Sequence, residues 1–229
     1  MAVPSKALIL KINKPDSIEY AKTASDSCDS VGLKWEYYEG YMDLPGRRAW
    51  ERIGIKLDWE IGAYPNEAIN PAECCTAGHI SMWKAISEGN DEAVIILEHD
   101  AVMLHPIEID IPDNMIVALG YKTKTPEKYD HVAAGKPTEI IIIDGHEGAH
   151  AYAITKKTAK MLIDEIEKRG KLRGAIDNAY FILGQRDTAV PLGIMSPTPA
   201  IGWLRKSTIW SESATKNCNF ITSFSKNYK

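Results

Sequence analysis

The chain has 229 residues, of which 45% are hydrophobic and 25% are charged, and its formal net charge is −4. This composition is typical of a globular protein with a real core, and the length favours one large domain. A weakly acidic chain offers no basic surface for nucleic acid, and its longest apolar runs, such as Ile140–Ile143, are far too short to cross a bilayer. We therefore expect a cytoplasmic protein without a nucleic-acid partner, a transmembrane segment or a secretory signal.

The first elements predict an α/β unit. Residues 7–12 are apolar and predict a buried strand, whereas residues 17–28 predict a helix. We expect Asp16 to cap this helix, because Glu19 follows it at the spacing of a capping box. Residues 33–40 predict a second strand, so the chain opens as β-α-β, which is typical of a parallel sheet.

A second helix and a buried strand follow the segment 41–72, whose prolines and glycines predict a loop with short helices. Apolar residues at helical spacing occupy 74–86, and the aliphatic run 94–97 stops abruptly at two carboxylates, Glu98 and Asp100. In open α/β sheets, ligands bind outside the carboxyl ends of the strands. Hard divalent cations that bridge phosphates are held by one or two carboxylates. This strand end therefore predicts a metal and phosphate site.

The second half of the chain continues the alternation of strands and helices. The expected strands cover 115–120, 140–143 and 150–155, and the expected helices cover 156–169 and 175–183. Thr155 and Gly170 are residue types that begin and end a helix. Beyond Pro191 the sequence contains few signals of regular structure. We expect one domain over residues 1–210, followed by a tail over residues 211–229.

Other chemical motifs are few. The chain has four cysteines without the Cys-x-x-Cys spacing of zinc and redox sites, so we expect structural thiols. It has no glycine-rich dinucleotide motif, no P-loop and no Gly-x-Ser-x-Gly elbow. The string His146-Glu147-Gly148-Ala149-His150 matches the His-Glu-x-x-His motif of zinc hydrolases, which must lie on a helix. Its glycines argue against a helix, and a zinc hydrolase acting through His146, Glu147 and His150 is kept as an alternative.

Three motifs together resemble glycosyltransferase family 25. They are Cys75-x-x-Gly78-His79-x-x-x-Trp83, then Ile95-Ile96-Leu97-Glu98-His99-Asp100-Ala101-Val102, then Gly148-Ala149-His150-Ala151-Tyr152. The family pattern runs Gly-Cys-x-x-Ser-His, then Leu-Glu-Asp-Asp, then Gly-Thr-His-Ala-Tyr, in the same order. The resemblance covers roughly residues 7–180. The chain departs from the pattern at Cys74, Gly78, His99 and Ala149.

The resemblance implies a GT-A fold, which is a single α/β/α sandwich with a mostly parallel central sheet. It also implies metal-dependent, inverting transfer of a hexose from a nucleoside diphosphate sugar to a hydroxyl group of a glycan acceptor. The donor expected from the family is UDP-galactose or UDP-glucose, with Mn²⁺ or Mg²⁺ across the diphosphate. Because His99 replaces an acid of the family pattern, a catalytically silent GT-A domain that binds nucleotide sugar or glycan is the other alternative.

The resemblance also suggests roles for single residues. Asp100 is the first expected metal ligand, with Glu98 beside it and His150 as a further ligand or phosphate contact. His79 is expected on the donor side, where it anchors the helix to the donor loop. Asp177 stands where the family carries an acid near the acceptor and is the candidate base, with Asp144 as the reserve candidate.

Overall fold

The computed structural model describes residues 1–42, 46–55, 57–59, 71–121, 137–146, 148–172, 175–181 and 188–202. Its centre is a seven-stranded sheet in the order β2-β1-β4-β9-β6-β11-β8. The strands are β1 (Ala7–Lys11), β2 (Trp35–Glu39), β4 (Ala93–Glu98), β6 (Ile116–Ala118), β8 (Glu139–Ile143), β9 (Ala151–Thr155) and β11 (Leu192–Ser196). Five of these seven run in the same direction, and β8 and β9 run against them.

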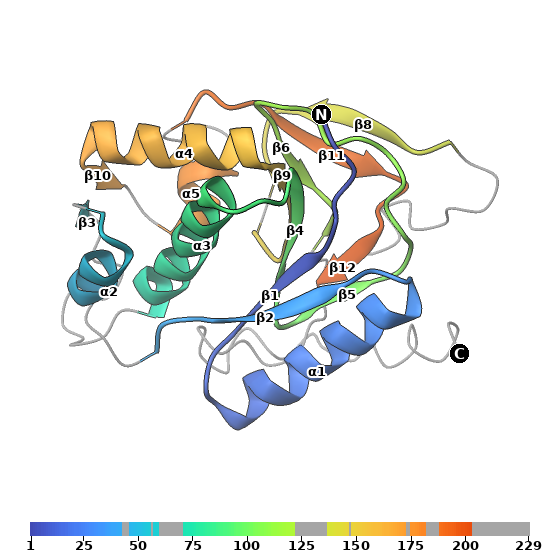
Figure 1. Ribbon diagram of the computed structural model, residues 1–229, viewed down its shortest axis with the longest axis horizontal. Coiled ribbons are helices and arrows are strands. Elements are labelled where there is room, and N and C mark those ends of the chain that lie inside the picture. Colours follow the sequence, from blue (N-terminus) through green and yellow to red (C-terminus); the bar gives the residue numbers. More distant parts are fainter. Residues whose placement is uncertain are drawn as a thin grey trace.

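Helices cover both faces of this sheet (Figure 1). One face carries α1 (Pro15–Ser30), and the other carries α3 (Pro71–Glu88), α4 (Lys156–Arg169) and α5 (Ile176–Tyr180). A hydrophobic core lies on each face of the sheet. Each strand contributes to both cores, because its side chains alternate between the two faces. Ile95 packs toward α1, for example, whereas Ile96 packs toward α3. The expected α/β/α sandwich with mostly parallel strands is confirmed.

Shorter elements complete the described fold. The helix α2 (Gly46–Ile53) packs against α3. Two small sheets join β3 (Asp58–Trp59) to β10 (Lys171–Leu172), and β5 (Ala101–Met103) to β12 (Ala200–Gly202) and β7 (Gly120–Tyr121). The second small sheet lies next to the end of β4, because β5 begins three residues after Glu98.

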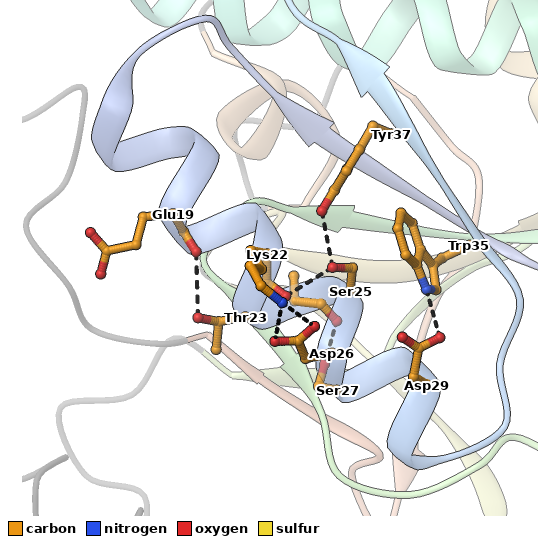
Figure 2. A network of polar contacts seen from close by, with 10 residues as sticks. Glu19, Lys22, Thr23, Ser25, Asp26, Ser27, Asp29, Trp35 and Tyr37 are labelled. Atoms are coloured by element: carbon orange, nitrogen blue, oxygen red, sulfur yellow. Dashed lines mark hydrogen bonds and ion pairs between the residues drawn. The ribbon is translucent and has the colours of Figure 1, made fainter.

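The opening β-α-β unit forms as expected, with β1 and β2 paired in parallel. The start of its helix was predicted wrongly: the N-cap is Lys14, and Asp16 lies in the first turn. Pro15 explains the difference, since its fixed φ suits the first helical position. Helix and strand are then tied by side chains, as Figure 2 shows: Ser25 Oγ lies 3.0 Å from the Tyr37 hydroxyl, and Trp35 Nε1 donates to Asp29 Oδ1 at 2.9 Å.

The helix α4 confirms its predicted ends. The Thr155 hydroxyl accepts the backbone N–H of Thr158 at 3.2 Å, and Gly170 follows the helix in the left-handed conformation. The buried stripe of α4 packs against α3, so a cap at Thr155 also supports the helix that carries the site described below.

Regular structure beyond Pro191 was missed by the sequence prediction, because β11 and β12 both lie there. Gly193 interrupts the apolar run of β11 and weakens its strand signal. The structure explains this glycine, since a Cβ at residue 193 would lie 2.7 Å from Ile140 Cγ2. The expected tail, 211–229, lies outside the described residues.

Candidate active site

The candidate site lies at the carboxyl edge of the sheet, where β4 ends. Glu98 is the last residue of β4, and the turn formed by His99 and Asp100 leads into β5. The neighbouring antiparallel strand β9 begins here, and the backbone N–H of Glu98 donates to the carbonyl of His150 at 2.8 Å. The sequence motif that contains Glu98 and the one that contains His150 therefore meet at this edge.

The helix α3 brings two more polar side chains to Glu98. Cys75 and His79 are four residues apart and thus lie one above the other on the same helix face. His79 Nε2 lies 3.3 Å from Glu98 Oε1, and Cys75 Sγ lies 3.8 Å from the same oxygen. One possible ligand atom from each of these three residues lies within 4.8 Å of the others. This contact joins α3 to the end of β4, and the expected role of His79 at a donor loop stays a prediction.

The other side of His79 is held by two aromatic residues of the core. His79 Nδ1 lies 2.9 Å from the hydroxyl of Tyr152, and the same hydroxyl accepts the indole N–H of Trp83 at 2.8 Å. All three side chains are fully buried. A continuous chain of hydrogen bonds therefore leads from the core of the protein to Glu98.

The candidate base Asp177 also approaches this group. It lies in the first turn of α5, whose position is fixed by a 3.0 Å hydrogen bond from the backbone N–H of Ile176 to Thr76 Oγ1 on α3. Burial raises the pKa of Asp177, the negative charge of Glu98 raises it further, and His79 acts in the opposite direction. The negative charge of Glu98 therefore reaches a carboxylate from a distant part of the chain.

The other expected metal ligands are buried near the same strand end. Asp100 is 7% exposed and His150 is 1% exposed. Within the described residues, however, the three-residue group that is close enough to share one ion consists of Cys75, His79 and Glu98. Cys75 was expected to be structural, and the signal that pointed to its place was its i, i+4 spacing from His79.

Asp144, the reserve base, lies far from Glu98. It follows β8, which is four positions away from β4 in the sheet, or roughly 19 Å at the usual strand spacing. The antiparallel register also pairs Ile143, the last residue of β8, with Leu192, the first of β11. Asp144 is exposed at the opposite edge of the sheet, so the structure does not bring it to the site.

The zinc-hydrolase motif lacks the helix that it needs. The described residues between Asp144 and His150 are not helical, and Gly148 has a φ of 81°. The rings of His146 and His150 are 6.2 Å apart, and burial lowers the pKa of His146 to about 4, although a hydrogen bond with the backbone of Gly120 opposes this shift. Both rings are therefore buried beside the site, and burial favours the neutral form of His146.

His99, the main departure from the family pattern, points away from Glu98. Its ring stacks on that of Tyr20 in α1, with centroids 6.0 Å apart and an angle of 16° between the planes. Glu98 instead contacts α3, on the other face of the sheet. The side chains of the adjacent residues Glu98 and His99 therefore lie on opposite faces of the sheet.

Comparison with solved structures finds glycosyltransferases and an inositol-1-phosphate CTP transferase from T. maritima, the latter at 12% identity and a TM-score of 0.40 over 96% of this chain and 98% of that one. The protein is 13% identical to the glycosyltransferase GlyE of Streptococcus pneumoniae TIGR4, with a TM-score of 0.41 over 98% of this chain and 65% of that one. The apo form of GlyE matches at 14% identity and a TM-score of 0.34, over 70% of this chain and 37% of that one. A glycosyltransferase involved in glycosylation of the major capsid of PBCV-1 matches at 12% identity and a TM-score of 0.34, over 72% of this chain and 67% of that one.

At these TM-scores the structural likeness is limited, and the likeness to a family rests on the sequence. No curated protein matches the chain significantly. In the part of the chain that the structure describes, no helix has both the length and the apolar character needed to cross a membrane. Residues 70–179 match the family described as glycosyltransferase family 25 (LPS biosynthesis protein), and this segment contains Cys75, His79, Glu98, Tyr152 and Asp177. The likeness to glycosyltransferase family 25 therefore extends over just under half of the chain and includes these site residues.

Proposed function

We propose that the chain is a metal-dependent, inverting glycosyltransferase that moves a hexose from a nucleoside diphosphate sugar to a hydroxyl group of a glycan. The observation that carries this proposal is the position of Glu98 and Asp100 at the carboxyl end of β4, inside the segment that matches the family. This edge is where open α/β sheets bind their ligands. An inverting transfer needs one group at the leaving diphosphate and another at the attacking hydroxyl, and the site offers an acid for each.

On the donor side we assign Glu98 and Asp100. Mn²⁺ and Mg²⁺ prefer oxygen ligands, so these two carboxylates suit such an ion, whereas the soft thiol of Cys75 does not. The side chain of Glu98 is 20% exposed and accessible to a ligand. When bound, the ion would neutralise charge on the leaving diphosphate. His150 borders Glu98 through the backbone and is the candidate phosphate contact.

On the acceptor side we assign Asp177 as the general base. The acceptor hydroxyl must lose a proton as its oxygen attacks the sugar, and a carboxylate with a raised pKa accepts that proton more readily than an ordinary one. Burial and the charge of Glu98 provide this rise in pKa. Direct displacement would invert the configuration at the anomeric carbon.

A catalytically silent domain that binds nucleotide sugar is the second candidate. The observation in its favour is His99, which stands where the family pattern has an acid and packs on Tyr20. Such a domain would bind UDP in the presence of Mn²⁺ but would release no sugar from any donor.

Hydrolysis of a panel of nucleotide sugars, with and without Mn²⁺, tests the proposal without knowledge of the acceptor. UDP-galactose and UDP-glucose are the first donors, and the proteins are wild type, Asp100→Ala and Asp164→Ala. Asp164 is a matched control because it lies exposed on α4, where it pairs with Lys160. We expect Mn²⁺-dependent release of UDP that is lost in Asp100→Ala and kept in Asp164→Ala. The anomer of the released sugar, followed by proton NMR before mutarotation, should be inverted.

Each other result contradicts a different part of the proposal. Release of UDP that needs no Mn²⁺ and persists in Asp100→Ala would overturn the proposed metal site but not the proposed sugar transfer. Mn²⁺-dependent binding of UDP without release from any donor would establish the silent domain. Neither release nor binding would overturn the proposed activity altogether.

A further inference from the structure

We propose that Trp83 and Tyr152 are positioning residues: they fix the proton of His79 on Nε2, so that His79 donates a hydrogen bond to Glu98 and holds its carboxylate in the site. The order of the hydrogen bonds follows from the chemistry of the groups alone. Their role in sugar transfer rests on the function proposed above.

The order starts at Trp83, because an indole nitrogen can only donate. Trp83 Nε1 lies 2.8 Å from the hydroxyl oxygen of Tyr152, which must therefore accept this bond. The hydroxyl keeps its own proton, since burial raises the pKa of Tyr152 well above the usual value. Tyr152 is fully buried, so that proton needs an acceptor within the protein.

The acceptor is His79. Among the described residues, the second polar atom at the Tyr152 hydroxyl is His79 Nδ1, at 2.9 Å. Tyr152 therefore donates to Nδ1, and this ring nitrogen carries a lone pair rather than a proton. A neutral imidazole then has its proton on Nε2.

The Nε2 proton points to Glu98. The distance from His79 Nε2 to Glu98 Oε1 is 3.3 Å, so the order runs from Trp83 through Tyr152 and His79 to the carboxylate, with each group donating to the next. The order also decides what the group of Cys75, His79 and Glu98 can do. A metal ion bound to this group would need a lone pair on Nε2, where the hydrogen bonds place a proton.

This series of hydrogen bonds, from Trp83 through Tyr152 and His79 to Glu98, is called the relay below. It makes Glu98 part of a rigid unit. Trp83 and His79 belong to α3, Tyr152 belongs to β9 and Glu98 ends β4, so three elements of the core fix one carboxylate oxygen. Groups that orient a ligand or reacting carboxylate from behind typically change affinity or activity roughly 10- to 100-fold when they are removed. Loss of the Tyr152 hydroxyl should have an effect of this size.

The nitrogen resonances of His79 test the order of the bonds directly. In wild-type protein labelled with ¹⁵N, long-range proton–nitrogen spectra, assigned by comparison with His79→Gln, should show the Nε2–H tautomer. In Tyr152→Phe, the Nδ1 resonance should move toward that of a ring nitrogen that accepts no hydrogen bond. A wild-type His79 with its proton on Nδ1 would overturn the relay, whether or not the protein transfers sugar.

Turnover of the nucleotide sugar tests the positioning role. We expect Tyr152→Phe to lower kcat roughly 10- to 100-fold. Tyr37→Phe is the matched control, because it removes a hydroxyl that bonds Ser25 on the opposite side of the sheet (Figure 2), and it should leave kcat unchanged. His79→Gln can still accept and donate, so it should retain more activity than His79→Leu.

The outcomes separate this inference from the proposed function. Wild-type activity that Tyr152→Phe retains would overturn the positioning role, even with the expected tautomer. Equal losses in His79→Gln and His79→Leu would show that His79 serves by packing and not by hydrogen bonding. A wild type that releases sugar from no donor would contradict the proposed function and with it the positioning role, and the nitrogen spectra would still decide the order of the bonds.

Discussion

Asp177 on α5 lies close enough to Glu98 at the end of β4 for the two carboxylates to affect each other. Burial is the largest cause of the raised pKa of Asp177, and the negative charge of Glu98 is the second. A protein does not place two acids together for stability, because both burial and repulsion oppose their ionisation. Such pairs occur where a reaction needs an acid or base with a shifted pKa.

Asp177→Asn should therefore abolish most of the activity. Asparagine has nearly the same shape but cannot take a proton from the acceptor hydroxyl, and general-base catalysis typically contributes roughly 10²- to 10⁴-fold. Transfer of sugar to water or to an acceptor, measured as released UDP, should fall by that factor. Asp164→Asn, on the exposed face of α4, should change nothing. Full activity in Asp177→Asn would remove Asp177 from the mechanism.

The same substitution should stabilise the protein near neutral pH. Because the pKa of Asp177 in the folded state is raised above 3.8, its contribution to stability is complete below pH 3.8. That contribution is lost as the pH rises through the folded-state pKa, since the folded protein must then hold a charged, partly buried carboxylate. The neutral amide has no such cost. Urea unfolding at several pH values should show an advantage of Asp177→Asn over wild type that grows with pH and then levels off.

An advantage that is equal at every pH would contradict this account. It would mean that Asn at 177 acts through packing or through the hydrogen bond from the backbone N–H of Asn178, and not through charge. Asp164→Asn again serves as the control, because Asp164 is solvent-exposed in an i, i+4 pair.

The contribution of His146 to the free energy of unfolding should depend on pH in the opposite direction. Its pKa is lowered from 6.5 to about 4 because the ring is buried. Between these pH values His146 is therefore protonated in the unfolded chain and neutral in the folded protein. The stabilising contribution is complete above pH 6.5 and is lost as the pH falls toward 4. A difference of this size corresponds to roughly 3 kcal/mol, since each pKa unit is worth about 1.4 kcal/mol. In His146→Asn the free energy of unfolding should fall less steeply over this range, and an unchanged slope would show that His146 does not titrate in this way.

Much of the fold could be predicted from local sequence. The strands β1, β4 and β9 are short apolar runs, and the helix α4 has its cap and its final glycine, so each signal is contained within a few residues. The sequence could not predict β11 in the same way. Its glycine at residue 193 makes room for Ile140 and Met115, and this requirement exists only after distant strands have paired.

The candidate site shows the same division. Glu98 was predicted because an acid that ends an apolar strand is visible in the sequence, and Asp177 was suggested by the family resemblance. The role of Tyr152 was not visible, because its hydroxyl matters only when β9 is placed between β4 and β6 and beneath α3. Asp144 also ends an apolar strand, but β8 is antiparallel to its neighbour and delivers Asp144 to the wrong edge.

The small sheet of β5, β12 and β7, beside the site, depends on close packing at Gly120. A Cβ at residue 120 would lie 1.7 Å from the carbonyl oxygen of Ala200, so Gly120→Ala must push β12 away from β7. We expect a loss of about 3 kcal/mol or more, since the contact is with backbone that cannot rotate away. Gly32→Ala is the control: its φ of +71° is unfavourable for alanine but its Cβ would meet nothing, so it should cost only about 1 kcal/mol. Because β12 also pairs with β5, which begins directly after Asp100, Gly120→Ala should weaken Mn²⁺-dependent binding of UDP in the protein that remains folded. Urea unfolding checks the first effect and titration with UDP checks the second, and equal losses of stability in the two variants would contradict the packing argument.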